Sequence, residues 1–322
     1  MENKPAPLVS VVCDTYNQSA YIGKAIDSFL MQQTTFPVEI ILHDDASTDG
    51  TADIVRQYAS AHPDRIRAVC RTENMFSRDP KILEHYVFPL ARGKYIAICE
   101  GDDYWTDPLK LAKQVAYMEA HPSCTLCFTA AELVDAAGNH AGWQRPYSVD
   151  ADVPTEDIIR GMGGFCPTAS LMAPTALAQN RAAFCDLTSV DDAPLQIFFA
   201  SRGETRYLAD ATCAYRVNAA GSWTLQQKKE SIDKKIALQK SLIAMHEAFD
   251  ADTDYRYHDA VAEALVKDRF EILWLTNDID EMKKLPYRTL YRTLSKRSRL
   301  RLHLIRRFPR LYGRIRHGRG NA

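Results

Sequence analysis

Residues 38–58, VEIILHDDASTDGTADIVRQY, contain a short apolar run, a polar turn and an amphipathic stretch in direct succession. The β-branched run 38–42 predicts a buried strand, and Ile54, Val55 and Tyr58 follow with the apolar spacing of a helix. The same order of strand, turn and helix is predicted for residues 8–30. Because chains that alternate strands with helices form parallel sheets with right-handed crossovers, we expect an α/β fold.

The rest of the chain divides into regions of different pattern. Further strands are expected at residues 66–70, 95–99, 125–134, 168–172 and 205–215. From about residue 226 the pattern becomes helical, over residues 232–249, 257–275 and 279–294. We therefore expect an α/β domain in residues 1–225, a helical region in 226–295 and a basic amphipathic tail in 296–322.

The net charge of −1 conceals a strong asymmetry along the chain. Residues 281–322 carry 14 Lys and Arg against one acid, a net +13, whereas residues 1–280 carry a net −14. A basic tail on an acidic body favours binding to an anionic surface, either lipid headgroups or nucleic acid. Residues 296–319 interleave leucines with arginines, which is typical of helices at a membrane interface, and Pro309 and Gly313 predict two short helices. We favour the membrane over RNA or a solvated tail.

The cysteines and the N-terminal residues indicate a compartment. Of the eight cysteines, only Cys124 and Cys127 form a C-x-x-C, and no second pair completes a zinc site, so we interpret both as strand residues. The N-terminal residues lack a basic leader with an apolar core, and no apolar run reaches the ~20 residues of a membrane span. We expect a cytoplasmic protein that associates peripherally with the inner face of the cell membrane.

An acidic cluster follows the strand expected at residues 95–99. Glu100-Gly101-Asp102-Asp103 places three carboxylates within four residues, where they would repel one another unless a cation lay among them. Hard oxygen ligands favour Mn²⁺ or Mg²⁺, and such ions bridge protein carboxylates and substrate phosphates. The alternative is an acidic surface loop that caps the next helix. The position of the acidic cluster at the end of an apolar strand favours the metal site.

A second pair of acids, Asp44 and Asp45, ends the strand at residues 38–42. Ligands of parallel α/β sheets gather beyond the carboxyl ends of the strands, so we expect both acidic clusters to meet there. A carboxylate at this place can accept a hydrogen bond from the N–H of a nucleobase. Ser47 and Asp49 are better explained as caps of the following helix.

Three segments carry a resemblance to a known family. Residues 9–33 (VSVVCDTYNQSAYIGKAIDSFLMQQ), 38–51 (VEIILHDDASTDGT) and 93–111 (GKYIAICEGDDYWTDPLKL) resemble the family 2 glycosyltransferases in order and spacing. The resemblance extends over roughly residues 8–220. It implies the GT-A fold, a Rossmann-like and mostly parallel sheet flanked by helices, here followed by a C-terminal helical extension.

The resemblance also implies an activity. Relatives of this kind transfer a hexosyl or N-acetylhexosaminyl group, with inversion, from a nucleotide-diphosphate donor such as a UDP-sugar. The acceptor is a hydroxyl of a glycan or of a lipid-linked acceptor in surface polysaccharide synthesis. The sequence leaves open which sugar and acceptor are used and whether the chain forms a homo-oligomer.

Roles for the nucleotide and the metal follow from the same resemblance. The aromatic residue beside the base corresponds to Tyr16, with Thr15 next to it, and the aspartate that binds the base ring corresponds to Asp45, with Asp44 adjacent. The motif that binds the ribose and the metal corresponds to Glu100-Gly101-Asp102, and Asp103 follows.

We assign Asp102 and Asp103 to the metal, and Glu100 and Gly101 to the nucleotide. The family usually has Asp in place of Glu100, so a longer side chain must reach the ribose or a water molecule.

A general base is expected in the second half of the domain. The family's base is an acid just before a helix, which corresponds to Asp192, with Asp191 in reserve. It would deprotonate the acceptor hydroxyl as that hydroxyl attacks the anomeric carbon. The alternative is an N-cap acid beside Pro194.

The loop after the last strand departs from the family pattern. Asn218 stands where relatives carry a histidine, and it is a weaker metal ligand. Arg216 is then a candidate for the diphosphate, and Trp223 either covers the sugar or belongs to the core.

Two rival functions remain at the level of sequence. A degenerate transferase that binds a nucleotide or acts as a scaffold at the membrane would explain Glu100 and Asn218. Nucleotidyl transfer shares the same sheet and metal chemistry, but residues 14–19 lack the glycine-rich, basic loop that binds a triphosphate.

Overall fold

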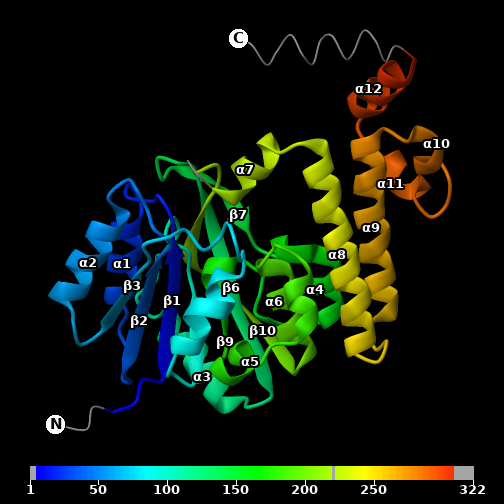
Figure 1. The fold of residues 1–322 in the computed structure, drawn as a ribbon. Helices are drawn as coiled ribbons and strands as arrows, with labels where there is room; N and C mark the ends of the chain where they lie inside the picture. The colour runs from blue at the N-terminus through cyan, green and yellow to red at the C-terminus, as the bar shows by residue number, and fades with distance from the viewer. Residues whose placement is uncertain (1–4, 220–221, 308–322) are drawn as a thin grey trace. The chain divides into compact units, whose positions relative to one another are not determined.

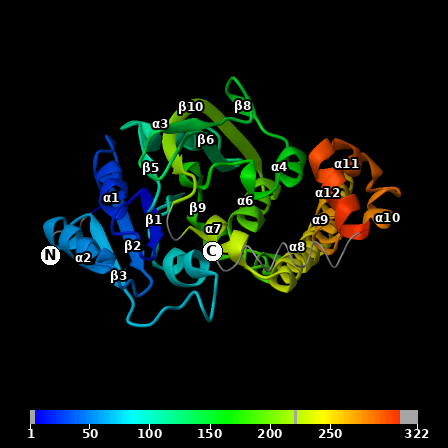
Figure 2. The same cartoon turned by 90° about the horizontal axis from the view of Figure 1, so that it is seen from above.

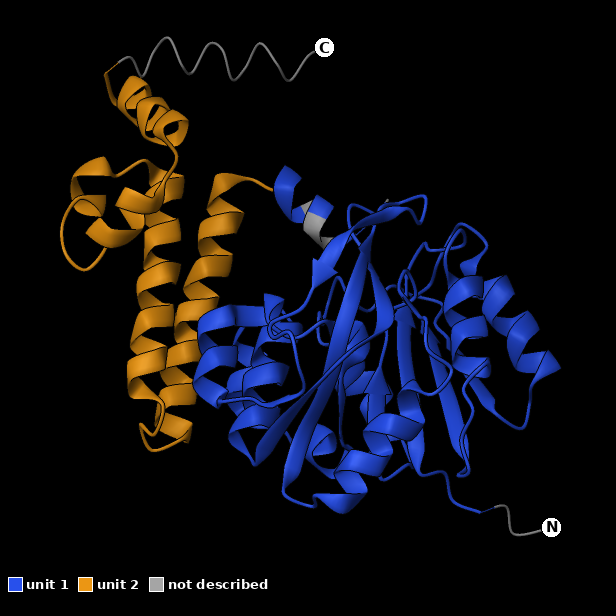
Figure 3. Cartoon of the chain, turned by 180° about the vertical axis from the view of Figure 1, so that it is seen from behind, with its two compact units in different colours: residues 1–229 blue, residues 230–322 orange. Residues whose placement is uncertain are grey.

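The computed structural model of the chain describes residues 5–219 and 222–307, apart from the side chains of Trp223, Thr224 and Gln226. The chain divides into two compact units, residues 1–229 and 230–322 (Figure 3).

The first unit begins with strands that alternate with helices, as the sequence predicts (Figure 1). The elements are β1 (Val9–Thr15), α1 (Ile22–Leu30), β2 (Val38–Asp44), α2 (Thr51–Ala61), β3 (Ile66–Cys70) and β4 (Tyr95–Ile98). The four strands pair in parallel in the order β3-β2-β1-β4, with Thr15 opposite Asp44 and Val12 opposite Ile98. Helices α1 and α2 lie together beside β1–β3 (Figure 2).

The second half of the sheet is mixed rather than parallel. The sheet continues from β4 through β9 (Met172–Pro174), β6 (Cys124–Val134), β10 (Glu204–Arg216) and β5 (Tyr104–Trp105). Strands β6 and β10 are parallel, whereas β9 is antiparallel to both β4 and β6. Strands β4 and β6 therefore run in the same direction. As a result, the carboxyl ends of β1, β2, β4, β6 and β10 lie at one edge of the sheet. This edge carries the predicted acids.

The first unit contains two further strands of this sheet and several helices. Strand β7 (His140–Gln144) pairs with β6, and β8 (Ala151–Asp152) pairs with β10. The helices are α3 (Lys110–Ala120), α4 (Thr155–Gly161), α5 (Thr175–Gln179), α6 (Asp192–Ser201) and α7 (Trp223–Lys229). A short π-helix, η1 (Leu83–Val87), lies between β3 and β4 in the chain.

Three local expectations differ from the structure. Residues 168–170 form a 3₁₀ turn ahead of β9 rather than a strand. Helix α2 starts after Gly50 without a side-chain cap, so Ser47 does not cap it. The helix expected at residues 279–294 is two short helices, α10 (Ile279–Met282) and α11 (Arg288–Thr293), separated by Leu285-Pro286. Proline lacks an N–H and interrupts a helix, which explains this break.

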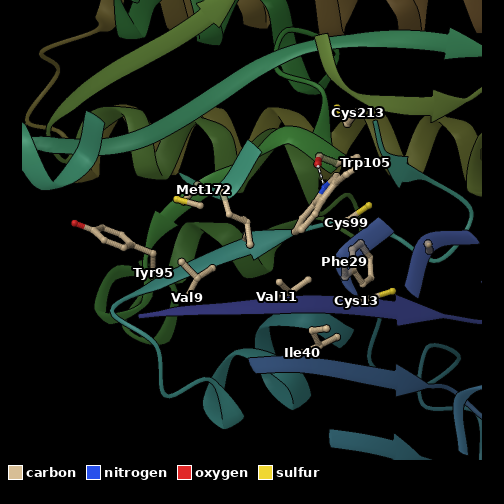
Figure 4. Packing of buried hydrophobic residues seen from close by; sticks show 14 of the residues in the cluster. Val9, Val11, Cys13, Phe29, Ile40, Tyr95, Cys99, Trp105, Met172 and Cys213 are labelled. Atoms are coloured by element: carbon tan, nitrogen blue, oxygen red, sulfur yellow. Dashed lines mark hydrogen bonds between the residues drawn. The ribbon is translucent and has the colours of Figure 1, made fainter. Parts of the chain in front are cut away.

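The core of the first unit holds the strand ends in place. Val9, Val11 and Cys13 of β1 pack with Ile40 of β2, and Phe29 of α1 lies edge-on to the Trp105 ring (Figure 4). The Trp105 indole N–H also donates to the Ala169 carbonyl at 2.8 Å. All eight cysteines are free thiols, and those at positions 124 and 127 lie buried on β6, as the sequence predicts.

The second unit is helical. Helices α8 (Ile232–Asp252) and α9 (His258–Thr276) pack side by side, joined by a buried His246–Asp268 contact of 2.8 Å. Helix α12 (Lys296–Arg307) buries Leu302 and exposes Leu300 and Leu304. Residues 308–322, the remainder of the predicted tail, lie outside the described part of the chain. None of the helices in the described ranges is both long and apolar enough to cross a lipid bilayer.

Candidate functional site

A cleft of about 370 Å³ is lined by the loops that follow the shared edge of strand ends. Eight of the residues predicted for the site line it: Thr15, Tyr16, Asp45, Glu100, Asp102, Asp191, Asp192 and Arg216. They come from the ends of β1, β2, β4 and β10 and from the start of α6. The fold thus brings predicted acids that are as much as 147 positions apart in sequence, Asp45 and Asp192, to one cavity.

Four predicted residues do not line the cleft. Asp44 is buried and accepts a hydrogen bond from the Ser47 N–H at 3.1 Å. Asp103 is 1% exposed and accepts one from the Arg216 N–H at 2.7 Å. Gly101 donates its N–H to the Asp14 carbonyl at 3.0 Å. Asn218 is exposed and accepts from Lys228 at 3.2 Å.

The side chain of Trp223 lies outside the described part of the chain. Its predicted role in covering the sugar therefore stays a prediction.

Gly101 lies in the turn after β4 and packs closely against the end of β1. A Cβ atom at this position would lie 2.5 Å from Gln18 Oε1 and 2.7 Å from Thr15 Oγ1. Glycine is therefore required here so that the turn after β4 can approach the turn after β1. This close approach brings Glu100 and Asp102 to the same cleft wall as Thr15.

The acids of the cleft raise one another's pKa values. Burial, followed by the charges of Asp103 and Asp14, raises the pKa of Glu100 well above its usual value, and burial also raises the pKa of Asp102. Burial and the charge of Asp191 raise the pKa of Asp14 to about 7. These carboxylates lose solvation and repel one another, so a positive charge in the cleft would stabilise their ionised forms.

Arg216 supplies positive charge behind the acids. Its guanidinium donates to the carbonyl of Asp102 at 2.9 Å and to those of Asp135 and Ala136 at 3.0 and 3.1 Å. The guanidinium also lies 4.5 Å from the centre of the Tyr21 ring. Arg216 therefore fastens the turn after β4 to the turn between β6 and β7.

The donor set suits a hard divalent cation. Within residues 5–219 and 222–307, no three His, Cys, Asp or Glu side chains are arranged to hold a metal ion by themselves. Mg²⁺ and similar ions, however, are commonly held by one or two carboxylates together with substrate phosphates. Glu100 and Asp102 line the cleft, and the buried Oδ1 of nearby Asp14 has no hydrogen-bond partner among the described residues. These oxygens fit such a shared site.

Asp45 holds an aromatic residue that the sequence analysis missed. Its carboxylate accepts hydrogen bonds from the N–H groups of Met75 and Phe76 at 2.7 and 3.0 Å. Asn74 donates to the Asp45 carbonyl at 3.2 Å. The Phe76 side chain is 42% exposed and lines the cleft, as does Tyr16, which is 43% exposed. No spacing pattern marks Phe76, because the loop after β3 reaches the cleft only through these contacts.

The turns after β1 and β2 are joined by their polar side chains. The N–H of Asn17 donates to Ser47 Oγ at 2.8 Å, and the N–H of Ser19 donates to Asp49 Oδ2 at 3.0 Å. Ser47 thus connects two loops of the cleft instead of capping α2. Asp49 connects them as well, and it also accepts a hydrogen bond from the Thr51 N–H at the start of α2.

Asp14 and Gln18, which the sequence analysis did not assign to the site, also line the cleft. The position of Asp14 near the end of a buried strand, like that of Asp44, is the signal that could have identified it.

Asp191 and Asp192 lie at the start of α6 and face the cleft. Asp192 Oδ1 accepts a hydrogen bond from the Ala193 N–H at 2.7 Å, and the N-terminus of a helix favours negative charge. Burial nevertheless raises the pKa of both, that of Asp191 to about 6. A carboxylate of this kind has a stronger affinity for a proton than an exposed one, as a general base requires.

Gly163 leaves space for the Asp192 carboxylate. A Cβ atom at Gly163 would lie 2.6 Å from Asp192 Cγ and from both of its carboxylate oxygens. A Cβ atom at the next residue, Gly164, would have nothing within 4 Å.

Sequence comparisons give two kinds of relative. An uncharacterized protein of Mycobacterium tuberculosis (strain ATCC 25618 / H37Rv) is 36% identical over 232 residues, which are 67% of this chain and 60% of that protein. The UDP-Glc:α-D-GlcNAc-diphosphoundecaprenol β-1,3-glucosyltransferase WfaP of Escherichia coli is 33% identical over 112 residues, 35% of this chain and 41% of WfaP. The chain thus spans less than two thirds of the length of these relatives.

Solved structures share the fold. Staphylococcus aureus TarS in complex with UDP-GlcNAc has a TM-score of 0.61 and 18% identity, over 84% of this chain and 73% of that one. The mannosyltransferase PcManGT of Pyrobaculum calidifontis, in complex with GDP-Man and Mn²⁺, has a TM-score of 0.53 and 19% identity, over 94% and 84%. Residues 10–166 match the family described as Glycosyl transferase family 2. With this match, the sheet order and the cleft, the chain belongs to glycosyl transferase family 2 and has the GT-A fold.

Proposed function

We propose that this chain is an inverting glycosyltransferase that moves a sugar from a nucleotide-diphosphate donor to a hydroxyl of a glycan or lipid-linked acceptor. The observation that carries the proposal is a cleft lined by carboxylates at the ends of three strands, β1, β2 and β4, and by the acids at the start of α6. Support for a UDP-type donor and a lipid-linked acceptor comes from the name of WfaP, and TarS binds UDP-GlcNAc. Surface polysaccharide synthesis is the pathway we propose.

We assign different residues of the cleft to the base, the ribose and the metal. We assign the base to Tyr16 and Phe76, which are partly exposed and line the cleft, and the ribose to Thr15 and Glu100 beside them. Asp102 and Glu100 would hold Mn²⁺ or Mg²⁺, which when bound neutralises the negative charge of the diphosphate. We assign Asp103 to the support of this turn, since its carboxylate is buried against the backbone of Arg216.

The transfer step needs a base on the acceptor hydroxyl. Asp192 accepts the proton of that hydroxyl while the hydroxyl oxygen attacks the anomeric carbon of the donor sugar. The bond from this carbon to the diphosphate oxygen breaks on the opposite face. The nucleoside diphosphate leaves, and the sugar is joined to the acceptor with inverted configuration. Because lipid-linked acceptors lie at a membrane, we propose that α12, with its arginines and exposed Leu300 and Leu304, associates with the inner, anionic face of the cell membrane.

The proposal is tested by turnover of a donor panel. UDP-glucose, UDP-GlcNAc and GDP-mannose are each incubated with the chain, Mn²⁺ and a polyprenyl-diphosphate-linked sugar acceptor. Release of nucleoside diphosphate and the anomeric configuration of the product are measured by chromatography and NMR. An inverted product supports the proposal. A retained configuration contradicts the inverting step, and a chain that binds the donors without turnover is the degenerate scaffold.

Phe76→Ala is expected to weaken UDP binding about 5–150-fold, since stacking on a base contributes roughly 1–3 kcal/mol in comparable sites. Phe76→Tyr keeps a ring face and is expected to retain affinity. Calorimetric titration with UDP and Mn²⁺ measures both. Leu187→Ala, which removes an exposed apolar side chain outside the cleft lining, is the control. Equal affinity of Phe76→Ala and wild type would remove Phe76 from the base site.

Gly163→Ala is expected to lower kcat about 100-fold, because the new methyl group displaces the Asp192 carboxylate and small misplacements of a reacting group are costly. The KM for the donor and the thermal stability should change little, since a single side-chain rotation relieves the clash. Gly164→Ala is the matched control, because its methyl group meets no atom within 4 Å. Steady-state kinetics of both variants check this, and similar kcat values would argue against Asp192 as the base.

A further inference from the structure

Lys81 is a buried cation behind the loop that precedes α6. Its side chain is 3% exposed, and its ammonium group donates to the Val190 carbonyl at 2.5 Å and lies 2.9 Å from Asp191 Oδ1. The partners are 109 and 110 residues away in sequence. One side chain thus holds the backbone and the carboxylate of the two residues that come directly before Asp192.

Glu84 is a second buried acid near this ammonium group. It lies one turn further along the chain, is 3% exposed, and neither of its carboxylate oxygens has a hydrogen-bond partner among the described residues. Burial and the charge of Asp191 raise the pKa of Glu84, and the charge of Lys81 acts in the opposite direction. The ion pair of Lys81 is made with Asp191.

A second set of contacts joins the same two segments. His85, on η1, lies 2.6 Å from Asp79 through Nδ1, and Arg181 lies 2.7 Å from its Nε2. Arg181 also contacts the Asp186 carboxylate. The segment around η1 therefore contacts both ends of residues 181–191. His85 contacts Arg181 at the beginning, and Lys81 contacts Asp191 at the end. Ile82, next to Lys81, lines the cleft.

These contacts give the two acids of α6 different surroundings. Asp191 is paired with a buried cation, which makes its carboxylate a poorer proton acceptor than an unpaired one. Asp192 has its Oδ1 on the Ala193 N–H and has Gly163 next to its carboxylate. We propose that Lys81 is a positioning residue of the transfer step, which anchors Asp191 and Val190 so that Asp192 is presented to the acceptor hydroxyl. This inference rests on the proposed function.

The test is a double-mutant cycle on kcat. Lys81→Met removes the ammonium group and keeps most of the apolar side chain, and Asp191→Asn removes the negative charge while keeping the shape. Each is expected to lower kcat about 100-fold, the loss that a reacting group displaced by about 1 Å produces. The KM for the donor should stay within about twofold, because the nucleotide contacts are elsewhere. The double variant should be about as slow as the slower single variant, since both changes remove the same contact.

Further measurements separate this role from a general loss of structure. Thermal unfolding and UDP titration show whether each variant is folded, and Lys94→Met, which breaks an exposed pair with Glu119, is the control for removal of an ion-paired lysine. If the loss of kcat in the double variant is the product of the losses in the two single variants, the residues act independently and the inference is overturned. A change in KM without a change in kcat would overturn it as well. If wild type turns over and Lys81→Met has the same kcat, the inference is overturned while the proposed function survives. A wild-type chain that turns over no donor overturns both.

Discussion

Asp192→Asn is expected to reduce sugar transfer about 10²–10⁴-fold, the usual contribution of a general base. The amide keeps the size of the side chain but cannot accept the proton of the acceptor hydroxyl. The affinity for UDP with Mn²⁺ should be unchanged, because Asp192 acts on the acceptor and the nucleotide contacts lie on the strand ends. Steady-state transfer and calorimetric titration of the same preparation separate the two quantities.

The matched control is Asp53→Asn, an exposed acid on α2 that pairs with Arg56 and does not line the cleft. This variant should retain transfer. Turnover at the wild-type rate in Asp192→Asn would exclude this residue as the base. Asp191, with its ammonium partner, would then be the next carboxylate to test.

Removal of divalent cations is expected to weaken UDP binding by about 100-fold or more, since a cation at a charged oxygen contributes several kcal/mol. Glu100, Asp102 and Asp14 line the cleft, and without a cation their ionised forms repel the diphosphate. The substitution Asp102→Asn should therefore have opposite effects on UDP affinity with and without the cation. That variant loses much of its Mn²⁺ response, but in chelator it should bind UDP at least as tightly as wild type, because one repelling charge is gone.

UDP titrations in Mn²⁺ and in EDTA, for wild type and Asp102→Asn, give the four affinities that this comparison needs. Asp210→Asn is the control, because that acid is exposed and pairs with Lys113 outside the cleft. Wild-type affinity that is indifferent to chelator would contradict a metal at Glu100 and Asp102.

The strand ends were predictable because their signals are local. A buried β-branched run followed by acids identifies the end of a parallel strand, and ligands gather beyond such ends. The positions of Asp45 and Asp102 at one cleft follow from this rule and from the sheet order. The bounds and the antiparallel direction of β9 did not follow, because its three residues carry too little pattern to distinguish the strand from the turn before it.

The sequence by itself determined the strands and helices of the first half and the acids at the strand ends, because apolar patterns and strand-end acids act over a few residues. The base candidates came from the family resemblance. Only the tertiary structure decided which acid of each pair faces the cleft. Asp45 and Asp102 line it, whereas Asp44 and Asp103 are buried against backbone N–H groups.

Asp44 is the last residue of β2 and Asp45 follows it, whereas Asp102 and Asp103 lie between β4 and β5. The packing of the whole sheet selects which of two neighbouring side chains faces the cleft. The structure likewise decided the contacts of Phe76 with Asp45 and of Lys81 with Asp191, since each joins segments 31 or more residues apart. Contacts of that range depend on how the chain folds back on itself, and no local pattern contains them.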